Sequence, residues 1–419
     1  MLPAAEFNQA LIAKYDRTGP RYTSYPTAPQ FSPTFGPEQY QHAAKISNQS
    51  GAPLSLYVHV PFCKSLCYYC GCHKIVTHKS ARAEQYLQYL KREIALQAAL
   101  FSPERSVSQL HLGGGTPTYF TLEQLADLMG ALKRAFRFVA DGTGEFSIEV
   151  DPRTVDPQGI HALKGLGFNR LSFGIQDFNL EVQQAVNRVQ SVEQTQALMS
   201  AARDAGFKSV SVDLIYGLPL QTAERFKYTL EQVIALRPER IATYSYAHMP
   251  QHIRAQRLIK REDMPPPERK LELLQLTIET LTKAGYVYIG MDHFALPNDE
   301  LCAARAQGTL QRNFQGYSTH AHCELIGLGV SSIGQIAGTY SQNAKDLKSY
   351  YAALDKLQLA VVRGYQLSVD DQLRRELISA IMCHGRVDFN ALEQRYGIDC
   401  SSYFANELAE LKRFAQDDL

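Results

Sequence analysis

From residue 54 onward, short apolar runs alternate with longer segments in which hydrophobic and polar residues follow a helical spacing. The short runs are typical of buried strands, and they lie at 54–60, 109–112, 146–150, 170–175, 209–215 and 240–246. Thr121 and Gln124 form a capping-box pattern in front of a segment whose apolar positions fall on one helix face. Ser191 and Gln194 repeat this signal, and a further helix is predicted over 222–236.

These six strands, separated by helices, predict parallel βα units joined by right-handed crossovers. Six units are too few for a closed eight-fold barrel. We therefore predict an α/β fold in which residues 51–340 form a partial (β/α)6 TIM-like barrel. Functional residues in such barrels gather at the carboxyl ends of the strands.

Two flanking regions depart from this pattern. Residues 1–50 contain Gly19-Pro-Arg-Tyr-Thr-Ser-Tyr-Pro-Thr27, whose prolines and tyrosines favour an extended, packed N-terminal arm over a helix. Toward the other end, helical spacing at 343–357, 370–382, 389–396 and 403–414 predicts a small helical C-terminal domain over 341–419. A helix that starts at Pro265-Pro-Pro267 and a strand at 286–289 are expected just before it.

The composition excludes several classes of protein. With 43 basic and 42 acidic residues, the net charge of +1 argues against a protein that coats nucleic acid. No apolar run approaches the length needed to span a bilayer, and residues 1–15 lack the pattern of a targeting signal. We expect a cytoplasmic monomer without nucleic-acid or membrane partners.

The strongest chemical signal is Cys63-Lys-Ser-Leu-Cys67-Tyr-Tyr-Cys70, directly after the first strand. Ordinary iron–sulfur clusters and structural zinc sites use four protein ligands. Three thiolates would leave one iron of a four-iron cluster open to a small chelating ligand. The amino and carboxylate groups of S-adenosylmethionine suit that position, and an electron from the cluster could then break its C–S bond and release a carbon radical.

A zinc site is the competing interpretation of the same loop. Cys72 extends the motif, so Cys63, Cys67, Cys70 and Cys72 could form a four-thiolate zinc knot. The C-x-C spacing is tight for a second chelating pair, which favours the cluster. Disulfides are less expected, because 8 cysteines in 419 residues is ordinary usage and no secretory signal precedes them.

Glycines and acids follow the next strands. Gly113-Gly-Gly-Thr-Pro-Thr118 removes side chains where a backbone must approach a ligand or a neighbouring chain closely. Glu149, near the end of the third strand, could accept hydrogen bonds from ribose hydroxyls. Asp213 lies within an apolar strand, where an acid is costly unless it is paired, and Arg188 is a candidate partner.

Taken together, these residues resemble the radical S-adenosylmethionine superfamily, and within it the oxygen-independent coproporphyrinogen III oxidase family. The resemblance covers nearly the whole chain. It rests on the arm motif at 19–27, Tyr57-Val-His-Val-Pro-Phe-Cys63, Cys67-Tyr-Tyr-Cys70-Gly-Cys72, Gly113-Gly-Gly-Thr-Pro-Thr118, Ser211-Val-Asp-Leu-Ile-Tyr-Gly-Leu-Pro219, Tyr246-Ala-His, Gly290-Met-Asp-His-Phe-Ala295 and Asn313-Phe-Gln-Gly-Tyr317. It implies a barrel of the radical SAM type and a C-terminal domain that is shorter than usual for the family.

The resemblance also implies a reaction. Two propionates of coproporphyrinogen III would be oxidatively decarboxylated to vinyl groups, giving protoporphyrinogen IX in haem synthesis, with an electron donor and an acceptor that the sequence does not identify. A 5′-deoxyadenosyl radical would take a hydrogen atom from the β-carbon of each propionate. The runner-up is a haem-binding chaperone of the same superfamily, which would generally lack the arm and a cysteine like Cys72. A zinc-stabilised scaffold without catalysis is the third alternative.

Site residues follow from the family's motifs. Cys63, Cys67 and Cys70 would hold a [4Fe-4S] cluster, and Cys72 matches a family cysteine that is not a ligand. The family binds two S-adenosylmethionine molecules. Matching positions for the first are Tyr57, Gly114, Glu149 and Ile333, of which Tyr57, Glu149 and Ile333 are the expected catalytic positions. Matching positions for the second are Tyr69, Gly115, Thr116, Gln176, Arg188, Asp213 and Ala247. Arg21 and Arg312 are candidates to bind the carboxylates of the substrate.

Overall fold

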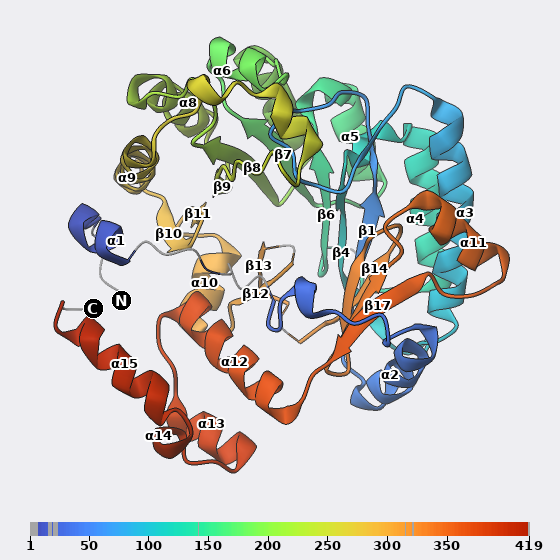
Figure 1. Cartoon of the computed structure of the whole chain (residues 1–419). Helices are drawn as coiled ribbons and strands as arrows, with labels where there is room; N and C mark the ends of the chain where they lie inside the picture. Colours follow the sequence, from blue (N-terminus) through green and yellow to red (C-terminus); the bar gives the residue numbers. More distant parts are fainter. Residues whose placement is uncertain are drawn as a thin grey trace.

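A large curved sheet organises the molecule (Figure 1). The computed structural model describes residues 7–15, 19, 24–140, 142–314, 316–320 and 322–417. The central strands, in spatial order, are β9 (Arg240–Ser245), β8 (Ser209–Tyr216), β7 (Arg170–Gln176), β6 (Glu145–Val150), β4 (Ser106–Gly114), β1 (Leu54–Val60) and β14 (Glu324–Leu328). These strands pair in parallel, and β1 lies between β4 and β14.

The six predicted strands are therefore all present and parallel, which confirms the partial barrel. The sheet also continues beyond them in both directions through antiparallel strands. On one side are β11 (His293–Ala295) and β10 (Val287–Gly290), and on the other β15 (Ile333–Ile336), β16 (Thr339–Asn343) and β17 (Val361–Gln366). The short pairs are β2 (Phe62–Cys63) with β3 (Ile75–Val76), β12 (Gln311–Asn313) with β13 (Gly316–Ser318), and β5 (Arg137–Phe138) with β4.

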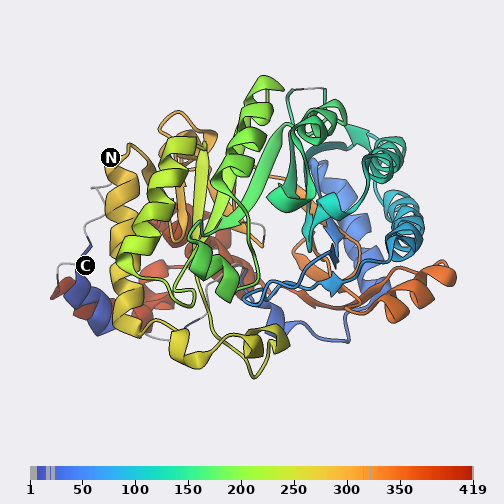
Figure 2. The ribbon, with the colours of Figure 1, turned by 90° about the horizontal axis from the view of Figure 1, so that it is seen from above.

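Helices cover the convex face of the sheet, and Figure 2 shows them as an outer ring around the curved strands. They are α3 (Ser80–Ala98), α4 (Leu122–Ala135), α5 (Pro157–Gly165), α6 (Leu180–Ala185), α7 (Val192–Asp204), α8 (Ala223–Leu236) and α9 (Pro267–Lys283). The predicted caps are in place, since the Thr121 and Ser191 side chains accept from the backbone N–H of Gln124 and Gln194.

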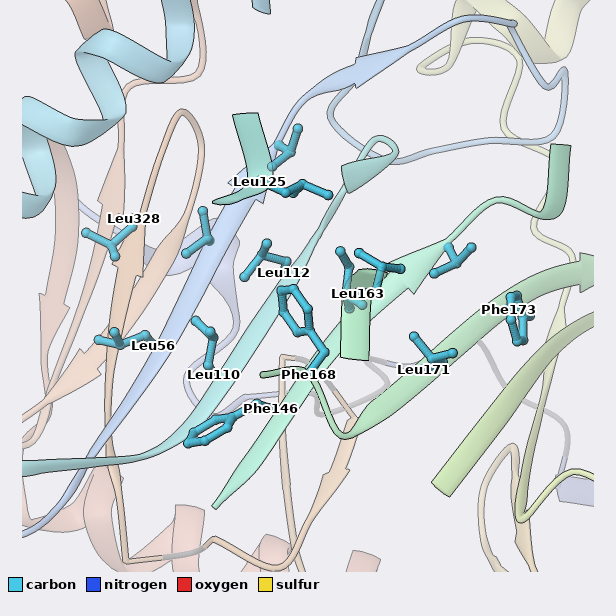
Figure 3. Packing of buried hydrophobic residues seen from close by; sticks show 14 of the residues in the cluster. Leu56, Leu110, Leu112, Leu125, Phe146, Leu163, Phe168, Leu171, Phe173 and Leu328 are labelled. Atoms are coloured by element: carbon cyan, nitrogen blue, oxygen red, sulfur yellow. The ribbon is translucent and has the colours of Figure 1, made fainter. Parts of the chain in front are cut away.

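The main core lies between these helices and the sheet. Leu110 and Leu112 of β4, together with Leu171 and Phe173 of β7, point toward the helices (Figure 3). Burying one such side chain contributes about 1.5–3 kcal/mol.

The concave face of the same strands is polar. In β4, Gln109 and His111 alternate with the core leucines, and in β8, Ser211 and Asp213 alternate with buried valines. Strands in parallel sheets are usually apolar on both faces, because both faces are covered. Here the inner face lines a polar cavity instead, so the alternation marks the side on which chemistry takes place.

The C-terminal region differs in part from the expected helical domain. The expected boundary at residue 340 falls inside β16, and β17 pairs with that strand, so the main sheet extends to Gln366. α11 (Leu347–Asp355) packs against α3. The purely helical part then comprises α12 (Val369–His384), α13 (Phe389–Tyr396), α14 (Cys400–Tyr403) and α15 (Ala405–Ala415). A separate helix, α10 (Glu300–Gln307), follows β11 earlier in the chain and packs against β10.

The N-terminal arm packs on the antiparallel end of the sheet. Phe31 stacks on Tyr340 of β16, and Ser32 forms a β-bridge with Gly364 of β17. The sequence analysis did not predict two helices of this region. α2 (Pro37–Ser50) packs near the contact, against β16 and β17, whereas α1 (Gln9–Tyr15) lies beside α15, where the Tyr15 and Phe414 rings meet. Arg21 lies outside the described residues. Among the helices of the described ranges, none combines the length and the apolar character needed to cross a membrane.

Candidate functional site: a cysteine loop above two adjoining cavities

The cysteine loop is held from several directions. Its first segment pairs with β3, so that the backbone N–H groups of Ile75 and Thr77 donate to the carbonyls of Pro61 and Cys63 at 2.7 and 3.0 Å. The segment after β7 closes it from the other side. There, the Asn187 side-chain amide donates to the Leu66 carbonyl at 2.9 Å. The loop is thus fixed by elements that lie both before and long after it in the chain.

Positive charge surrounds the middle cysteine. Arg153 and Arg188 each donate to Cys67 Sγ at 3.6 Å. The Thr116 hydroxyl donates to Cys63 Sγ at 3.4 Å. Thiolates are the form that binds iron, and nearby cations and hydrogen-bond donors favour that form. The two arginines and the threonine thus place positive charge and a hydrogen-bond donor beside sulfurs that would carry negative charge in a bound cluster.

The outer cysteines differ in acidity. A hydrogen bond with Cys72 is the main reason why the pKa of Cys70 falls to about 6; burial opposes this shift, and the Lys74 ammonium reinforces it. Burial raises the pKa of Cys63 to about 11, although the hydrogen bond from Thr116 opposes this. Cys72 thus acts in the structure as a partner of the Cys70 sulfur.

The fit to a cluster rests on a shared cavity. Cys63, Cys67 and Cys70 all line one cavity of about 460 Å³ at the carboxyl ends of the parallel strands, and Cys72 lines it as well. Three thiols that face one cavity fit as ligands of a group that fills part of it, with the cluster as the candidate. The cavity alone does not separate these three from Cys72, so that distinction rests on the resemblance to the family.

The glycine run allows the end of β4 to lie very close to the end of β1. A Cβ on Gly115 would lie 2.7 Å from the backbone carbonyl of Pro61, and one on Gly114 would lie 2.6 Å from the His59 ring. Gly114 also has a φ of +117°, which disfavours any other residue. Of the two uses predicted for this run, the structure exhibits close approach to a neighbouring chain segment, here the start of the cysteine loop.

Glu149 lies at the centre of the concave face. Its carboxylate accepts from the Gly114 N–H at 3.1 Å and from His111 Nε2 at 3.1 Å. Burial alone would raise the pKa of Glu149, but the hydrogen bond and charge of His111, with the Gly114 N–H, bring it below its ordinary value. The side chain keeps 40% of its exposure because it opens into the cavity. Glu149 is therefore an ionised acceptor with room for a ligand hydroxyl.

Tyr57 and His59 of β1 form a fixed pair beside it. His59 Nε2 donates to the His73 carbonyl at 3.0 Å. Burial lowers the pKa of His59 to about 4, so its ring is neutral near pH 7 and its Nδ1 accepts from the Tyr57 hydroxyl at 3.0 Å. The Tyr57 ring also stacks on His111. This network orients the aromatic face of Tyr57 in the cavity.

Asp213 and Arg188 are not paired with each other, contrary to the suggestion from the sequence. Arg188 forms an ion pair with Asp151 at 3.0 Å, and it also donates to the Gly174 carbonyl. Asp213 accepts from the Ser172 hydroxyl at 3.3 Å. Burial raises the pKa of Asp213 to about 7, and the charge of Glu149 adds to this shift. Asp213 is thus poised between its two protonation states.

The predicted site residues separate onto two adjoining cavities. All four positions matched to the first S-adenosylmethionine line a cavity of about 910 Å³: Tyr57, Gly114, Glu149 and Ile333. Most positions matched to the second line the cavity of about 460 Å³: Tyr69, Gly115, Thr116, Gln176, Arg188 and Asp213. Both cavities are lined by Cys70, Gly114, Glu149 and Tyr244.

Ala247 is the one matched position that lines neither cavity. It is linked to the smaller one by Gln256, which donates to the backbone carbonyls of Ala247 and of the lining residue Tyr69 at 3.0 and 3.1 Å.

Gln176, in the smaller cavity, has a φ of +70°, and its buried Oε1 has no hydrogen-bond partner among the described residues. A buried acceptor without a partner is costly, and a ligand donor would satisfy it.

Sequence reasoning missed several contributors. His111, Asp151 and Arg153 line the cavities or contact the cysteines, yet they were not singled out. His111 and Asp151 follow the signal that identified Glu149, a polar residue at or near the carboxyl end of a parallel strand. Arg153 has no such signal, because only the folded chain brings it to Cys67.

Comparison with known proteins agrees with this geometry. The model of the radical SAM superfamily matches residues 57–233. The chain is 50% identical to the oxygen-independent coproporphyrinogen III oxidase of Pseudomonas aeruginosa over all of its residues and 91% of that protein. It is 49% identical to the enzyme of the same name from Escherichia coli, over 99% of the chain and 90% of that protein.

A solved structure shows the same fold. The coproporphyrinogen III oxidase from Escherichia coli, described as a radical SAM enzyme, superimposes with a TM-score of 0.94. The two sequences are 48% identical, and the match covers 99% of this chain and 93% of the other. A [4Fe-4S] cluster and S-adenosylmethionine are the cofactors of this class, and the thiols and cavities described above fit them. On this identity and coverage, the chain belongs to the oxygen-independent coproporphyrinogen III oxidase family of the radical SAM superfamily.

Proposed function

We propose that this chain catalyses the oxygen-independent oxidative decarboxylation of coproporphyrinogen III to protoporphyrinogen IX. The observation that carries the proposal is that the matched positions line two adjoining cavities, which share Glu149 and Gly114 and meet beside Cys70. One cavity suits a cofactor bound next to the thiols, and the other leaves space for a second molecule. The full-length similarity to coproporphyrinogen III oxidases supports the choice of substrate.

The chain's own residues bind and orient the reactants. Cys63, Cys67 and Cys70 would hold the cluster. When bound and reduced, the cluster supplies the electron that cleaves S-adenosylmethionine and yields the radical that takes a hydrogen atom from the substrate. Glu149, ionised and open to the cavity, accepts hydrogen bonds from ribose hydroxyls. Tyr57 presents its ring beside this position, where aromatic faces stack on flat ligand groups.

The proposed reaction needs an electron donor and an electron acceptor in addition to this chain. Each propionate loses one hydrogen atom and one electron, and its Cα–carboxyl bond breaks to give a vinyl group and carbon dioxide. An electron donor reduces the cluster and an acceptor removes the electron from the substrate. We retain the expectations of a monomer that works in the cytoplasm.

Product formation under anaerobic conditions tests the function. The protein is reconstituted with iron and sulfide, reduced, and incubated with S-adenosylmethionine and coproporphyrinogen III. We expect protoporphyrinogen IX, detected by chromatography after oxidation, together with 5′-deoxyadenosine. Deoxyadenosine without any decarboxylated product would contradict the proposed substrate and would favour the haem-chaperone alternative.

An Asp213→Asn variant tests the second cofactor position. We expect it to bind the second S-adenosylmethionine about 10-fold more weakly, because one of the two carboxyl oxygens that can accept a hydrogen bond is replaced by an amide NH2 group, which can only donate. Iron content should not change, because Asp213 lies on β8 outside the cysteine loop and bonds to Ser172 of the neighbouring strand. Equilibrium dialysis with labelled cofactor measures the number of molecules bound per chain.

Asp204→Asn, the same exchange at an exposed residue at the end of α7, is the matched control and should behave like the wild type. Arg188 is a less selective choice, because it also contacts Cys67 and Asp151. A loss of iron in the Asp213 variant would show that the division into two cofactor positions is wrong.

A further inference from the structure

A third cavity lies on the side of the barrel away from the cysteines. Its volume is about 420 Å³, and it is enclosed by α12, the β12–β13 hairpin and the arm residues Ser24 and Tyr25. None of the residues matched to the cluster or to either S-adenosylmethionine lines it. The reaction as described so far therefore gives this cavity no role.

Its charge is strongly positive for its size. The cationic side chains among its described lining are Arg312, Arg375 and Arg395, joined by two histidines. Glu376 is the one carboxylate in that lining, and it is already engaged by Arg395 at 2.8 and 2.9 Å and by the Tyr396 hydroxyl at 2.9 Å. Arg375 thus supplies a positive charge that this carboxylate, already engaged by Arg395, does not balance.

Arg375 is the clearest of these groups. Its Nη1 is buried and has no hydrogen-bond partner among the described residues. Elsewhere on the same guanidinium, Arg375 has a hydrogen bond with the Tyr340 hydroxyl. The acids on the same helix are occupied: Asp371, one turn earlier, accepts from Tyr365 and Ser368, and Asp370 pairs with Arg374. A charged donor that is buried without an acceptor costs more than a neutral one, so an anion at this point would be stabilising.

Arg312 faces the same interior from the hairpin. Its guanidinium lies 5.6 Å from the centre of the Tyr317 ring. Its charge, after burial, helps to lower the pKa of His293 to about 3. The positive charge of Arg312 therefore acts on groups inside the barrel.

The third cavity is connected to the cavity beside Cys70 through residues that line more than one cavity. Gln109, Asn313 and Ser318 line both this cavity and the small polar one in the barrel interior. That interior cavity in turn shares His111, Glu149 and Tyr244 with the cavity beside Cys70. A flat molecule bound beside the cysteines could therefore extend toward α12.

We infer that Arg375 and Arg312 form a carboxylate-binding subsite for the two propionates of the substrate that are not decarboxylated. This inference rests on the proposed function. Four carboxylates decorate coproporphyrinogen III, and two of them survive in the product. Arginine is suited to carboxylates because its planar fork donates two parallel hydrogen bonds.

The placement away from the cysteines has a chemical reason. A carboxylate that leaves as carbon dioxide loses its charge during the reaction, and a tight arginine pair would stabilise the ground state and oppose that loss. Permanent anchors therefore serve best on the propionates that keep their charge. When the two surviving propionates are held, the opposite rim of the macrocycle, which carries the two reacting propionates, is positioned near the cofactor.

An Arg375→Met variant tests the subsite. We expect it to bind coproporphyrinogen III about 10- to 100-fold more weakly, the loss typical of a charged hydrogen bond. Iron content and the deoxyadenosine formed without substrate should stay at wild-type levels. Binding is measured anaerobically by titration with coproporphyrinogen III, and KM and kcat by product formation. Arg375→Lys should recover part of the affinity.

Two controls make the result specific. Arg374→Met removes the adjacent arginine of α12, which is already paired with acids, and should leave binding unchanged. A coproporphyrinogen whose two surviving propionates are converted to primary amides should bind the wild type and Arg375→Met equally, because the anchored charge is gone.

The outcomes separate this inference from the proposed function. If the wild type binds coproporphyrinogen III but gives no product, while Arg375→Met loses binding, the subsite stands and the proposed function fails. If the wild type turns over normally and Arg375→Met keeps its KM, the subsite is overturned. Equal weakening of the tetra-acid and the amide analogue would also overturn it, since the residue would then act only on local structure.

Discussion

A Cys67→Ala variant is expected to hold no stable cluster and to release no 5′-deoxyadenosine above background. Cys67 is buried, with 8% of its surface exposed, and Arg153 and Arg188 both donate to its sulfur. Removal of the thiolate deletes one of three ligands. Arg153 and Arg188 stay paired with Asp151 and are cations that cannot bind iron, so the side chains around the gap are not expected to replace the ligand.

Iron and sulfide content per chain, together with chromatography for 5′-deoxyadenosine, measure this effect. Cys72→Ala is the matched control, because Cys72 contacts the Cys70 sulfur and is not expected to bind iron. It should retain the cluster. If Cys67→Ala kept cofactor cleavage, or if Cys72→Ala lost its iron, the assignment of the three ligands would have to be changed.

Replacement of Glu93 by alanine is expected to lower the free energy of unfolding by about 3–5 kcal/mol. Glu93 is 0% exposed on α3, and three donors meet at its carboxylate. The Gly329 N–H and the Tyr350 hydroxyl donate to one oxygen, each at 2.6 Å, and the Asn343 amide donates to the other at 2.6 Å. Alanine would leave all three buried donors without this acceptor.

The same residues support the cofactor cavity. The network fixes the turn between β14 and β15, from which Ile333 and Ser331 face the larger cavity. The midpoint of thermal unfolding of the cluster-free protein measures the loss of stability. Glu84→Ala, on the exposed face of the same helix, should stay within about 0.5 kcal/mol of the wild type. A similar loss in both variants would indicate a general effect on α3 rather than on the network.

Glu93 also predicts a pH dependence. Burial raises its pKa from the ordinary value of 4.5 to about 7, although its three donors oppose this. A raised pKa means that the folded state favours the protonated form. The stabilisation is therefore complete below about pH 4.5 and is lost as the pH rises through about 7. Glu93→Gln, which cannot titrate, should not lose this contribution, so the unfolding midpoints of the two proteins should diverge across this range.

Much of the fold was predictable because strong local patterns specify it. The run at 54–60 became β1 with the same bounds, and Thr121 and Ser191 cap the helices that they predicted. β16 was missed because Thr339–Asn343 is almost entirely polar yet fully buried. Its side chains are accommodated by hydrogen bonds such as that of Asn343 with Glu93, which depend on residues far away in sequence.

The candidate site shows the same limit. The cysteines, Glu149 and the glycine run could be identified because their types and positions already constrain the chemistry. The partner of Arg188 could not, since Asp151, directly after β6, and Asp213, inside β8, are both acids on the same sheet, and only the folded chain shows which of them Arg188 contacts. Arg375 lies on a helix with ordinary amphipathic spacing, and only the enclosure of its Nη1 distinguishes it from Arg374.

The way in which the cysteine loop is held has a consequence for the growing chain. β1 pairs on one edge with β4 and on the other with β14, whose residues 324–328 are made more than half the chain later. Arg188 and Asn187, which grip the loop, also follow it by over a hundred residues. During synthesis the three thiols are therefore exposed to the solvent well before their enclosure exists. Iron loading should be a late event, completed only after β14 has been made and the sheet has closed.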